Sequence, residues 1–456
     1  MEAKASFSFM KIPTASKPIT RRHFLSLAGV AGAAVAFPTI IPSSVLGLGG
    51  RPAPSERIVV GIFGWGMMAP GNTEGLMKLP DCQVVASCNI DKNHLKRSLN
   101  AINGHYKNKD CKAYHDYRKM LARKDIDAVM IAVPDHWHEL IAVEAAKRGK
   151  DIYGEKPLAK TIAEQQNIVR AVQANGRIWQ TGSWQRSSGS FHKAAEIVRN
   201  GLIGKVTRVE VGLPSGHTDF SKDGTGKEKM PMNPPKVLDY NTWIGPSRMV
   251  PYIPARSHLN WRWNYNTGGG QLMDWAGHHV DIAHWGLGFD RNGPSEIEGH
   301  GEFPPWDAVW NTCTKYKIEL QYPEDVHMTI AGGYDEIKGG TKWIGTTGWV
   351  YVDRGKFEAS NEDWKDIKEL PDDQAKIKLI RSTDHYRNFI DSVKSRQPTI
   401  TPVETAHHST IPGHLGLISM LVGRKLRWDV EKEEILDDPE ASLLMTRPYR
   451  NPYKIG

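Results

Sequence analysis

Residues 57–69 read RIVVGIFGWGMMA, and they decide the fold of the first half of this 456-residue chain. The run that ends at Gly64 is short, rich in β-branched residues and free of charge after its first residue, which is typical of a buried strand. Gly64, Gly66 and Ala69 then form a G-x-G-x-x-A pattern. The first glycine permits a tight turn, the second lets a pyrophosphate approach the backbone, and the small third residue lets the next helix pack on the sheet. We therefore predict a strand, a phosphate-binding turn and a helix.

Strands and helices keep alternating after this turn. Further buried strands are expected at 82–90, 126–133 and 151–153, and helices at 94–106, 137–148 and 161–173. Alternation at this spacing predicts a parallel, doubly wound sheet. The chain is therefore expected to begin its fold with a Rossmann dinucleotide-binding domain over residues 55–180.

The pattern changes after about residue 180. Longer, more alternating strand candidates are found at 205–213, 315–322, 326–332 and 349–352, and helices are expected near 271–287, 375–395 and 405–426. The stretch 215–237 is rich in Gly, Pro and Lys and predicts a loop. We expect a second α/β domain over 181–430, built on an open and mostly antiparallel sheet, followed by a tail over 431–456.

Residues 1–50 have the sequence of an export signal. Arg21-Arg22 is followed by an aromatic and an aliphatic residue and then by the uncharged stretch LSLAGVAGAAVAF at 25–37. That stretch is too short and too rich in Gly and Ala to span a bilayer stably. We predict a twin-arginine (Tat) signal and an exported, periplasmic protein without a stable membrane span. No Ala-x-Ala site is evident, so cleavage and an uncleaved anchor both stay open.

Charge and composition exclude several classes of protein. The net charge of +8 is uneven, because residues 1–50 alone carry five basic residues and one acidic residue. No dense run of Lys or Arg follows, so a nucleic-acid partner is not expected. With 39% hydrophobic and 24% charged residues, the chain resembles an ordinary soluble protein. Its cysteines are too few for a disulfide framework and lack zinc spacing, so they are predicted to be buried: Cys82, Cys88, Cys111 and Cys313.

The end of the second predicted strand bears on the choice of cofactor. An acid that binds the adenosine ribose is expected about 20 residues after the glycine-rich turn, but Asn89 stands there and Asp91 follows. Asparagine can bond a ribose hydroxyl without repelling a 2′-phosphate, and Lys92 or Arg97 could accept that phosphate. NAD and NADP are therefore both possible.

Two further motifs carry candidate chemistry. Gly154-Glu155-Lys156-Pro157 follows a buried strand at the carboxyl edge of the sheet, where ligands of open α/β folds bind. In GGGQLMDWAGHHVD at 268–281, Asp274, His278 and Asp281 fall within about 60° of each other on one helical face. A carboxylate one turn from an imidazole can orient it as a general base. A surface ion pair is the simpler alternative, and a metal site is disfavoured because a fourth ligand is missing.

Two clusters give weaker signals. His136-Trp137-His138 follows the third predicted strand and either borders the nicotinamide or caps the next helix. The aromatic run at 261–265, WRWNY, could stack on a sugar ring, although such runs more often belong to a core.

Taken together, GIFGWG, AVPDHWHELIAVEAAKRGKDIYGEKPLA and GGGQLMDWAGHHVD resemble, in this order, the Gfo/Idh/MocA family over about 55–430. The segment GRKLRWD is also similar to the tail of exported bacterial members. The resemblance implies a tightly held nicotinamide cofactor, sugar or polyol substrates, and a dimer or tetramer formed through the open sheet. It further implies that Lys156 holds the reacting hydroxyl, that His278 takes its proton, and that Asp274 binds substrate and orients His278.

The departures from the family pattern are Asn89 and the bulky phosphate turn. The expected cofactor contacts are Gly64, Trp65, Gly66, Met67, Met68, Asn89, Asp91, Pro134, His138, Glu155 and Lys156. The expected substrate contacts are Lys156, Arg186, Tyr265, Asp274 and His278. No metal ligand is expected.

The expected activity is that of an exported NAD(P)-dependent oxidoreductase acting on a CH–OH group of a sugar, polyol or glycoside. Outside the cytoplasm no pool of free NAD(P) exists, so the cofactor is expected to stay bound and to be restored in each cycle. Two alternatives stay open. One is a glycosidase or lyase that uses bound NAD for transient oxidation, and the other is a non-catalytic carbohydrate-binding protein.

Overall fold

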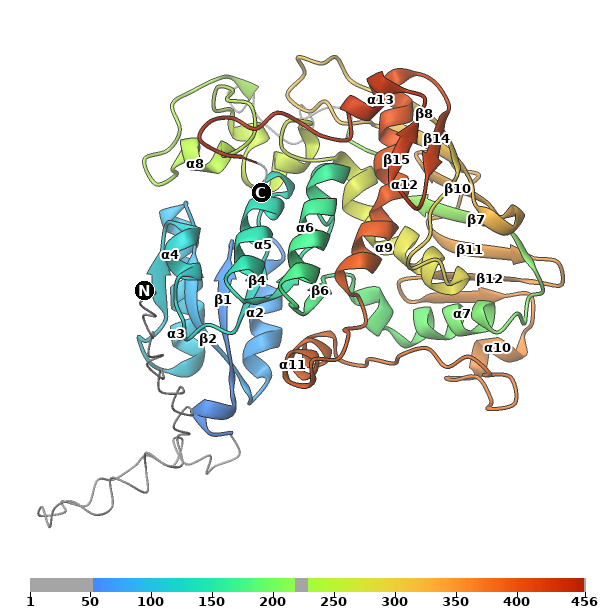
Figure 1. Ribbon diagram of the computed structural model, residues 1–456, viewed down its shortest axis with the longest axis horizontal. Coiled ribbons are helices and arrows are strands. Elements are labelled where there is room, and N and C mark those ends of the chain that lie inside the picture. Colours follow the sequence, from blue (N-terminus) through green and yellow to red (C-terminus); the bar gives the residue numbers. More distant parts are fainter. Residues whose placement is uncertain (1–51, 218–228, 455–456) are drawn as a thin grey trace, which may run out of the picture. The chain divides into compact units, whose positions relative to one another are not determined.

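The structure is a computed structural model, and it describes residues 52–217 and 229–454. The described residues from 55 onward form one compact unit that contains two sheets (Figure 1). The predicted export signal at 1–50 lies outside the described residues.

The first sheet is parallel and six-stranded, in the order β3-β2-β1-β4-β5-β6. Its strands are β1 (Ile58–Phe63), β2 (Cys82–Cys88), β3 (Lys112–Tyr114), β4 (Ala128–Ile131), β5 (Asp151–Gly154) and β6 (Trp179–Thr181). The strand order reverses between β1 and β4, and such a switch point opens a ligand crevice at the carboxyl ends of the strands. The predicted doubly wound sheet is confirmed.

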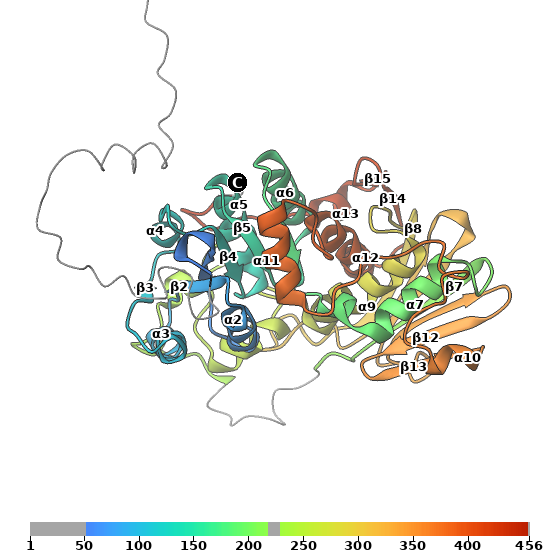
Figure 2. The ribbon, with the colours of Figure 1, turned by 90° about the horizontal axis from the view of Figure 1, so that it is seen from below.

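Helices cover both faces of this sheet. One face packs on α4 (Tyr117–Leu121), α5 (His138–Lys147) and α6 (Ile162–Ala174), and the other on α2 (Ala69–Lys78), α3 (Lys92–Tyr106) and α11 (His385–Ser395). Helix α11 comes from late in the chain, yet Phe389, Ile390 and Val393 complete the core of the first domain (Figure 2). Arg387 of this helix donates to both carboxylate oxygens of Asp81, at 2.6 and 2.9 Å.

The second sheet has nine strands in the order β13-β12-β11-β7-β10-β9-β8-β14-β15. The strands are β7 (Val206–Leu213), β8 (Glu296–Glu302), β9 (Lys315–Gln321), β10 (His327–Gly332), β11 (Gly340–Gly345), β12 (Trp349–Asp353), β13 (Lys356–Ala359), β14 (Leu426–Asp429) and β15 (Glu434–Leu436). All pairs are antiparallel except β7 with β10. The predicted open, mostly antiparallel sheet is confirmed.

One face of the second sheet carries the helices that complete its core. They are α7 (Gly189–Arg199), α9 (Gly270–Leu287) and α12 (Val403–Val422). The short helices α10 (Asp363–Asp366) and α13 (Pro439–Leu443) add Trp364 and Ala441 to the same core, and α8 (Tyr240–Ile244) belongs to a smaller cluster. The opposite face bears ion pairs such as Arg208 with Glu210 at 3.1 Å and Lys317 with Glu319 at 3.3 Å. This face is therefore polar, and none of the helices in the described part of the chain forms a layer over it.

Several elements differ from the sequence prediction. Strand β8 was not predicted because it has glycines where strands usually carry β-branched residues, and α12 packs against those positions. A Cβ on Gly299 would lie 2.6 Å from the carbonyl oxygen of Gly416, and one on Gly301 would lie 2.3 Å from Met420 Sδ. Strand β11 likewise has glycine at both ends, and helix α7 was also missed.

The late helices are shorter than predicted. Helix α11 begins at His385 and not near 375, because the Asp384 side chain accepts from the backbone N–H groups of Tyr386 and Arg387. Helix α12 ends at Val422, since Gly423 takes a left-handed conformation with φ of 68°. The predicted tail at 431–456 contributes β15 and α13 before it returns to the first domain.

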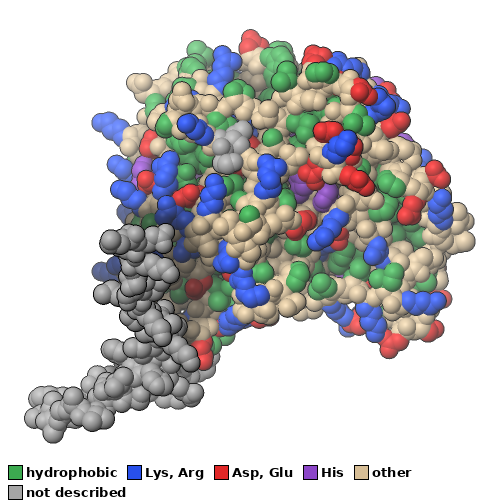
Figure 3. Space-filling model, viewed as in Figure 1, with side chains coloured by type: hydrophobic (Ala, Val, Ile, Leu, Met, Phe, Trp, Pro, Cys, Tyr) green, Lys and Arg blue, Asp and Glu red, His purple; other side chains and the backbone are tan. Residues whose placement is uncertain are grey.

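The charged side chains and the cysteines are distributed as the sequence predicts. Figure 3 shows basic and acidic side chains interspersed on one face, so charge of one sign does not gather there. All four cysteines are buried, as predicted, and none forms a disulfide with another. Within residues 52–217 and 229–454, no helix combines the length and the apolar character that crossing a membrane requires.

Candidate functional site

A cleft of about 630 Å³ lies at the carboxyl ends of β1, β2, β4 and β5 and is closed on its other side by residues 242–262 of the second domain. It runs from the glycine-rich turn to Lys156. The predicted cofactor contacts that line it are Gly64, Trp65, Gly66, Met67, Met68, Asn89, Asp91, Pro134, Glu155 and Lys156. The fold thus brings almost the whole predicted set into one cavity.

The glycine-rich turn has the conformation that a bound pyrophosphate requires. Gly64 has φ of +89°, and a Cβ there would lie 2.1 Å from the carbonyl oxygen of Ala132. Gly66 has no atom within 4 Å of its Cβ position, so its backbone faces open space. Helix α2 starts at Ala69 beside it and offers unpaired N–H groups, although Pro70 in its first turn contributes none. The turn therefore fits a dinucleotide.

At the far end of the cleft, Asn89 and Asp91 use part of their polar groups locally. The Asn89 Oδ1 accepts from the backbone N–H of Asp91 at 2.9 Å. The Asp91 Oδ1 caps helix α3 by accepting from the N–H groups of Asn93 and His94. Both Oδ1 atoms are thus used by these local bonds, and neither is reserved for a ribose hydroxyl. The geometry at this end therefore does not distinguish NAD from NADP.

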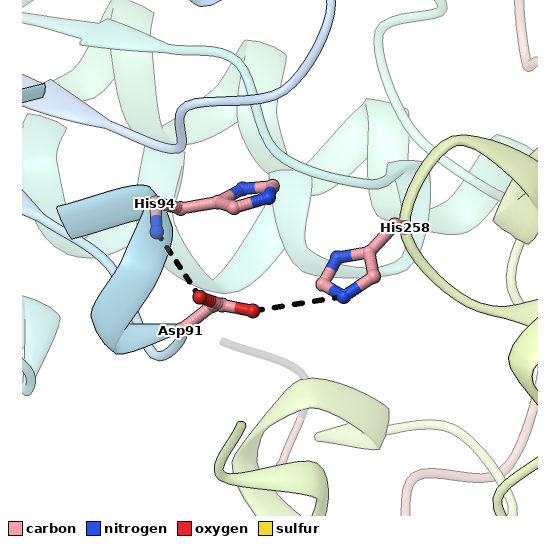
Figure 4. Close-up of side chains that lie close together, drawn as sticks. All are labelled: Asp91, His94 and His258. Atoms are coloured by element: carbon pink, nitrogen blue, oxygen red, sulfur yellow. Dashed lines mark hydrogen bonds and ion pairs between the residues drawn. The ribbon is translucent and has the colours of Figure 1, made fainter. Parts of the chain in front are cut away.

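Figure 4 shows two imidazoles beside that cap. Ligand-type atoms of Asp91, His94 and His258 lie within 4.8 Å of one another, and His258 Nε2 lies 3.6 Å from Asp91 Oδ2. The rings are stacked, with centroids 5.0 Å apart and planes at 29°. An imidazole binds a metal in its ring plane, and stacked planes do not converge on a nearby point. Burial lowers the pKa of both histidines, so this end of the cleft presents neutral imidazoles.

At the opposite end, Lys156 joins the two domains. Its Nζ donates to the backbone carbonyl of Asp274 at 2.6 Å and to Asp274 Oδ1 at 2.8 Å. Arg262 Nε donates to the same Oδ1 at 3.2 Å. Helix α9 approaches closely, since a Cβ on Gly277 would lie 3.0 Å from Lys156 Cβ. Burial alone would raise the pKa of Asp274, but the two cations outweigh it and lower that pKa.

His278 is buried next to this pair. Its Nδ1 has no hydrogen-bond partner in the described part of the chain. Burial, and then the charges of Lys156 and Arg354, hold the pKa of His278 well below 6.5, so the ring is neutral at physiological pH. The predicted orienting bond from Asp274 is not formed, because its carboxylate binds Lys156 and Arg262 instead. The helix that carries both residues was predicted, but cations from distant segments bind the carboxylate.

Glu155 is a second polar group at this end. Its Oε1 accepts from Asn72 Nδ2 at 2.6 Å, and Tyr386 donates to Asn72 Oδ1 at 2.9 Å. Its Oε2 is buried and without a partner among the described residues, and burial raises the pKa of Glu155. Glu155 is therefore held rigidly and keeps one oxygen for a donor in the cleft.

Asp274 and His278 contact or adjoin Lys156 but are not among the residues that line the cleft, and three further predicted contacts also lie away from it. The ring nitrogens of His138 are each 2.9 Å from a carbonyl oxygen, of Pro157 and of Val133, so this residue supports the Lys156 turn from behind. Arg186 is 2% exposed and binds Asp281 and Asp290, which places it in a buried ion cluster. Tyr265 is partly buried, with Lys160 Nζ 4.1 Å from its ring centroid.

The sequence analysis missed three residues near the reactive end. Arg262 lies within the aromatic run at 261–265, where the aromatic rings were considered and the arginine was not. Asp135 lines the cleft, and burial raises its pKa to about 7. Arg354 comes from the turn between β12 and β13, about 80 residues after Asp274, and no local motif marks it.

Comparisons with known proteins agree with this geometry. Residues 58–183 match the family model described as "Oxidoreductase family, NAD-binding Rossmann fold", and residues 189–455 match "Oxidoreductase family, C-terminal alpha/beta domain". Among curated relatives, a glycosyl hydrolase family 109 protein of Shewanella sp. is 30% identical over 209 residues, 42% of this chain and 45% of that protein. Inositol 2-dehydrogenase of Salmonella typhimurium is 32% identical over 149 residues, 32% of this chain and 42% of that enzyme.

Among solved structures, the WlbA dehydrogenase of Chromobacterium violaceum, in complex with NADH and UDP-GlcNAcA, has a TM-score of 0.62 at 16% identity. That match covers 83% of this chain and 98% of the dehydrogenase, and it shows the shared fold. The chain spans less than half the length of the two curated relatives it matches. The two family models, in contrast, account for nearly all of residues 58–455. The chain therefore belongs to the Gfo/Idh/MocA family of oxidoreductases, with its NAD-binding Rossmann domain and its C-terminal α/β domain.

Proposed function

We propose that this protein is an NAD(P)-dependent oxidoreductase that acts on a CH–OH group of a sugar, polyol or glycoside. The observation that carries the proposal is the reactive end of the cleft. There the Lys156 ammonium is fixed 2.8 Å from Asp274 Oδ1, beside a buried and neutral His278. A cation and a neutral imidazole together are what the removal of a hydroxyl proton needs.

The residues divide the work as follows. The turn at 64–69 would hold the pyrophosphate of the cofactor, and Glu155 Oε2 would accept from a donor on its nicotinamide half. The bound nicotinamide supplies the hydride acceptor. Lys156 donates to the substrate oxygen and stabilises the negative charge that develops on it. His278 accepts the hydroxyl proton, and Asp274 keeps the Lys156 ammonium in place.

Export and a permanently bound cofactor are part of the proposal. The sequence at 1–50 supports transport of a folded protein, which carries its cofactor with it. The enclosure of the cleft by residues 242–262 and by Tyr453 supports slow release. Replacement of Arg21 and Arg22 by lysine should keep the protein in the cytoplasmic fraction, and unchanged periplasmic recovery would refute export by the twin-arginine route.

The open face of the nine-stranded sheet supports a further part of the proposal, a homo-oligomer that is a dimer or a tetramer. Light scattering on the purified protein tests it. A monomer at micromolar concentration would contradict it.

A second candidate function is favoured by the family 109 relatives. In this alternative, a glycoside would be oxidised transiently, lose its leaving group by elimination, take up water at the resulting double bond and be reduced again. The hydride removed in the first step would be returned in the last, so sugar would be released without net redox change. The residues required are the same, and only the fate of the oxidised substrate differs.

The first experiment is nucleotide analysis of protein purified without added cofactor. The protein is denatured, and the released nucleotide is identified by mass and quantified by absorbance. About one NAD or NADP per chain is expected. A protein that is empty and also fails to bind added NAD or NADP would refute both candidate functions. A screen of polyols and glycosides then distinguishes the two candidate functions. A net rise in absorbance at 340 nm indicates dehydrogenation, and release of free sugar without such a rise indicates cleavage.

A further inference from the structure

Arg354 stands beside the reactive end without a carboxylate partner. It lies in the exposed turn between β12 and β13, and its guanidinium carbon is 4.7 Å from the ring centroid of Trp184 and 4.6 Å from that of Trp275. Its one hydrogen bond to a side chain is a long one, from Nη2 to Gln185 Oε1 at 3.4 Å. Among the described residues it forms no ion pair, because the adjacent Asp353 faces His279 at 3.6 Å.

Trp275 links Arg354 to the proposed catalytic residues. It follows Asp274 in helix α9, and its ring centroid is 5.7 Å from that of His278. The Arg354 charge also contributes to the low pKa of His278. Arg354 is therefore close enough for its charge to act at the reactive end.

Arg354 is the cation at this end that keeps its donors for an anion. Lys156 and Arg262 both pair with the carboxylate of Asp274, and Glu155 and Asp135 also attract them. Asp353 and Asp274 attract Arg354 only at longer range, since no carboxylate among the described residues forms an ion pair with it. A guanidinium is a planar fork of donors that matches a carboxylate, and the flat indoles offer a surface for a sugar ring.

We propose that the protein takes an acidic sugar as its substrate, with the sugar carboxylate on Arg354 and the ring against Trp184 and Trp275. Trp184 is 39% exposed and Trp275 is partly exposed, so both rings are accessible. This inference rests on the proposed function, because it names the substrate class of the same site. It places the sugar carboxylate beside Trp275, next to the reactive end.

The test is calorimetric binding to the intact protein with matched probes. The probes are methyl glucopyranoside and its uronate, and methyl galactopyranoside and its uronate. The uronate of at least one pair should bind about 10- to 100-fold tighter than its neutral partner, which is what one charge-assisted contact contributes. High salt should reduce this difference, because the contact is near the surface.

Two variants locate the effect. Arg354→Gln should abolish the preference for the uronate, and Arg354→Lys should keep part of it. The matched control is Lys342→Gln on strand β11, which removes a cation that lies 4.8 Å from the ring of Trp349 on strand β12 and should leave the preference unchanged. Bound nucleotide should be unaltered in all three variants.

Any one of three results would overturn the inference. The first is equal binding of the neutral and acidic probes, and the second is a preference for the uronate that survives Arg354→Gln. The third is that none of the uronates binds at its highest soluble concentration. Each of these outcomes leaves the bound nucleotide and its dependence on the 64–69 turn intact, so failure of the substrate class is distinguishable from failure of the oxidoreductase function.

Discussion

Replacement of Lys156 by methionine tests the reactive end most directly. Methionine keeps the unbranched stem that packs beside Gly277 and removes only the ammonium. Two hydrogen bonds to Asp274 are lost, at 2.6 and 2.8 Å. A hydrogen bond that involves a charged group contributes about 1.5–3 kcal/mol. Because Arg262 still binds the carboxylate, we expect the free energy of unfolding to fall by about 2–4 kcal/mol.

The expected loss of activity is much larger than this loss of stability implies. Removal of one preorganised donor to a developing oxyanion costs about 10²–10³ in rate. The rate is measured at 340 nm with the best sugar or polyol from the screen, on protein whose bound nucleotide has been quantified. Loss of the neighbouring positive charge should also raise the pKa of His278, and NMR titration of its ring measures that change.

Lys150→Met is the matched control. Lys150 is also buried, and its Nζ donates to the backbone carbonyls of Arg123 and Ile126, both at 2.7 Å. Its loss should lower stability to a similar extent and leave the rate unchanged, because Lys150 does not line the cleft. If Lys156→Met retains more than about a tenth of the rate, or if both variants lose activity equally, the assigned role of Lys156 is wrong.

Three shorter predictions address the cofactor turn, the base and the domain junction. Gly64→Ala forces a Cβ to 2.1 Å from a carbonyl oxygen at a positive φ, so bound nucleotide should be lost, which mass analysis detects. The pKa of His278 is held below 6.5 by burial first, so the rate should not fall between about pH 8 and pH 6, and a midpoint near 6.5 would contradict this. Burial would raise the pKa of Asp81, but Arg387 and Lys394 outweigh it and lower it to about 2. Its stabilisation is thus present above its ordinary pKa of 3.8 and lost as the pH falls toward 2, so Asp81→Asn should cost about 1–2 kcal/mol in urea unfolding at neutral pH and little in acid.

The first domain could be predicted closely because its information is local. Strands β1, β2, β4 and β5 were predicted because each is a short and largely apolar segment, whereas β3 and β6 have three residues each and were missed. The glycine-rich turn, Lys156 and the helix at 270–287 each lie in or next to a recognisable motif. The second sheet was harder to predict, since β8 and β11 contain glycines that only the close approach of other segments explains.

In the candidate site, too, local features could be predicted and contacts with distant segments could not. Positions on one face of helix α9 follow from its periodicity, and the structure pairs Asp274 with Lys156 and Asp281 with Arg186. Their partners do not follow from periodicity. Arg262 and Arg186 take the two carboxylates, and Arg354 arrives from a turn on the far sheet. A contact between residues far apart in the chain cannot be predicted from a single sequence unless a motif marks both residues.

The path of the chain has a consequence for how cofactor can leave the cleft. The chain exits the first domain after β6, comes back with α11, departs again with α12, and returns through residues 447–453. Arg447 then donates to Glu164 at 2.6 Å, and Arg450 donates to the carbonyl of Gly245 at 3.0 Å. A simple hinge between two domains needs one or two pliable connections, and this interlaced route ties them at several separate places. Exchange of nucleotide should therefore proceed by local loosening of residues 447–453 and not by a hinge motion of the two domains. This segment would then determine how long the nucleotide stays bound.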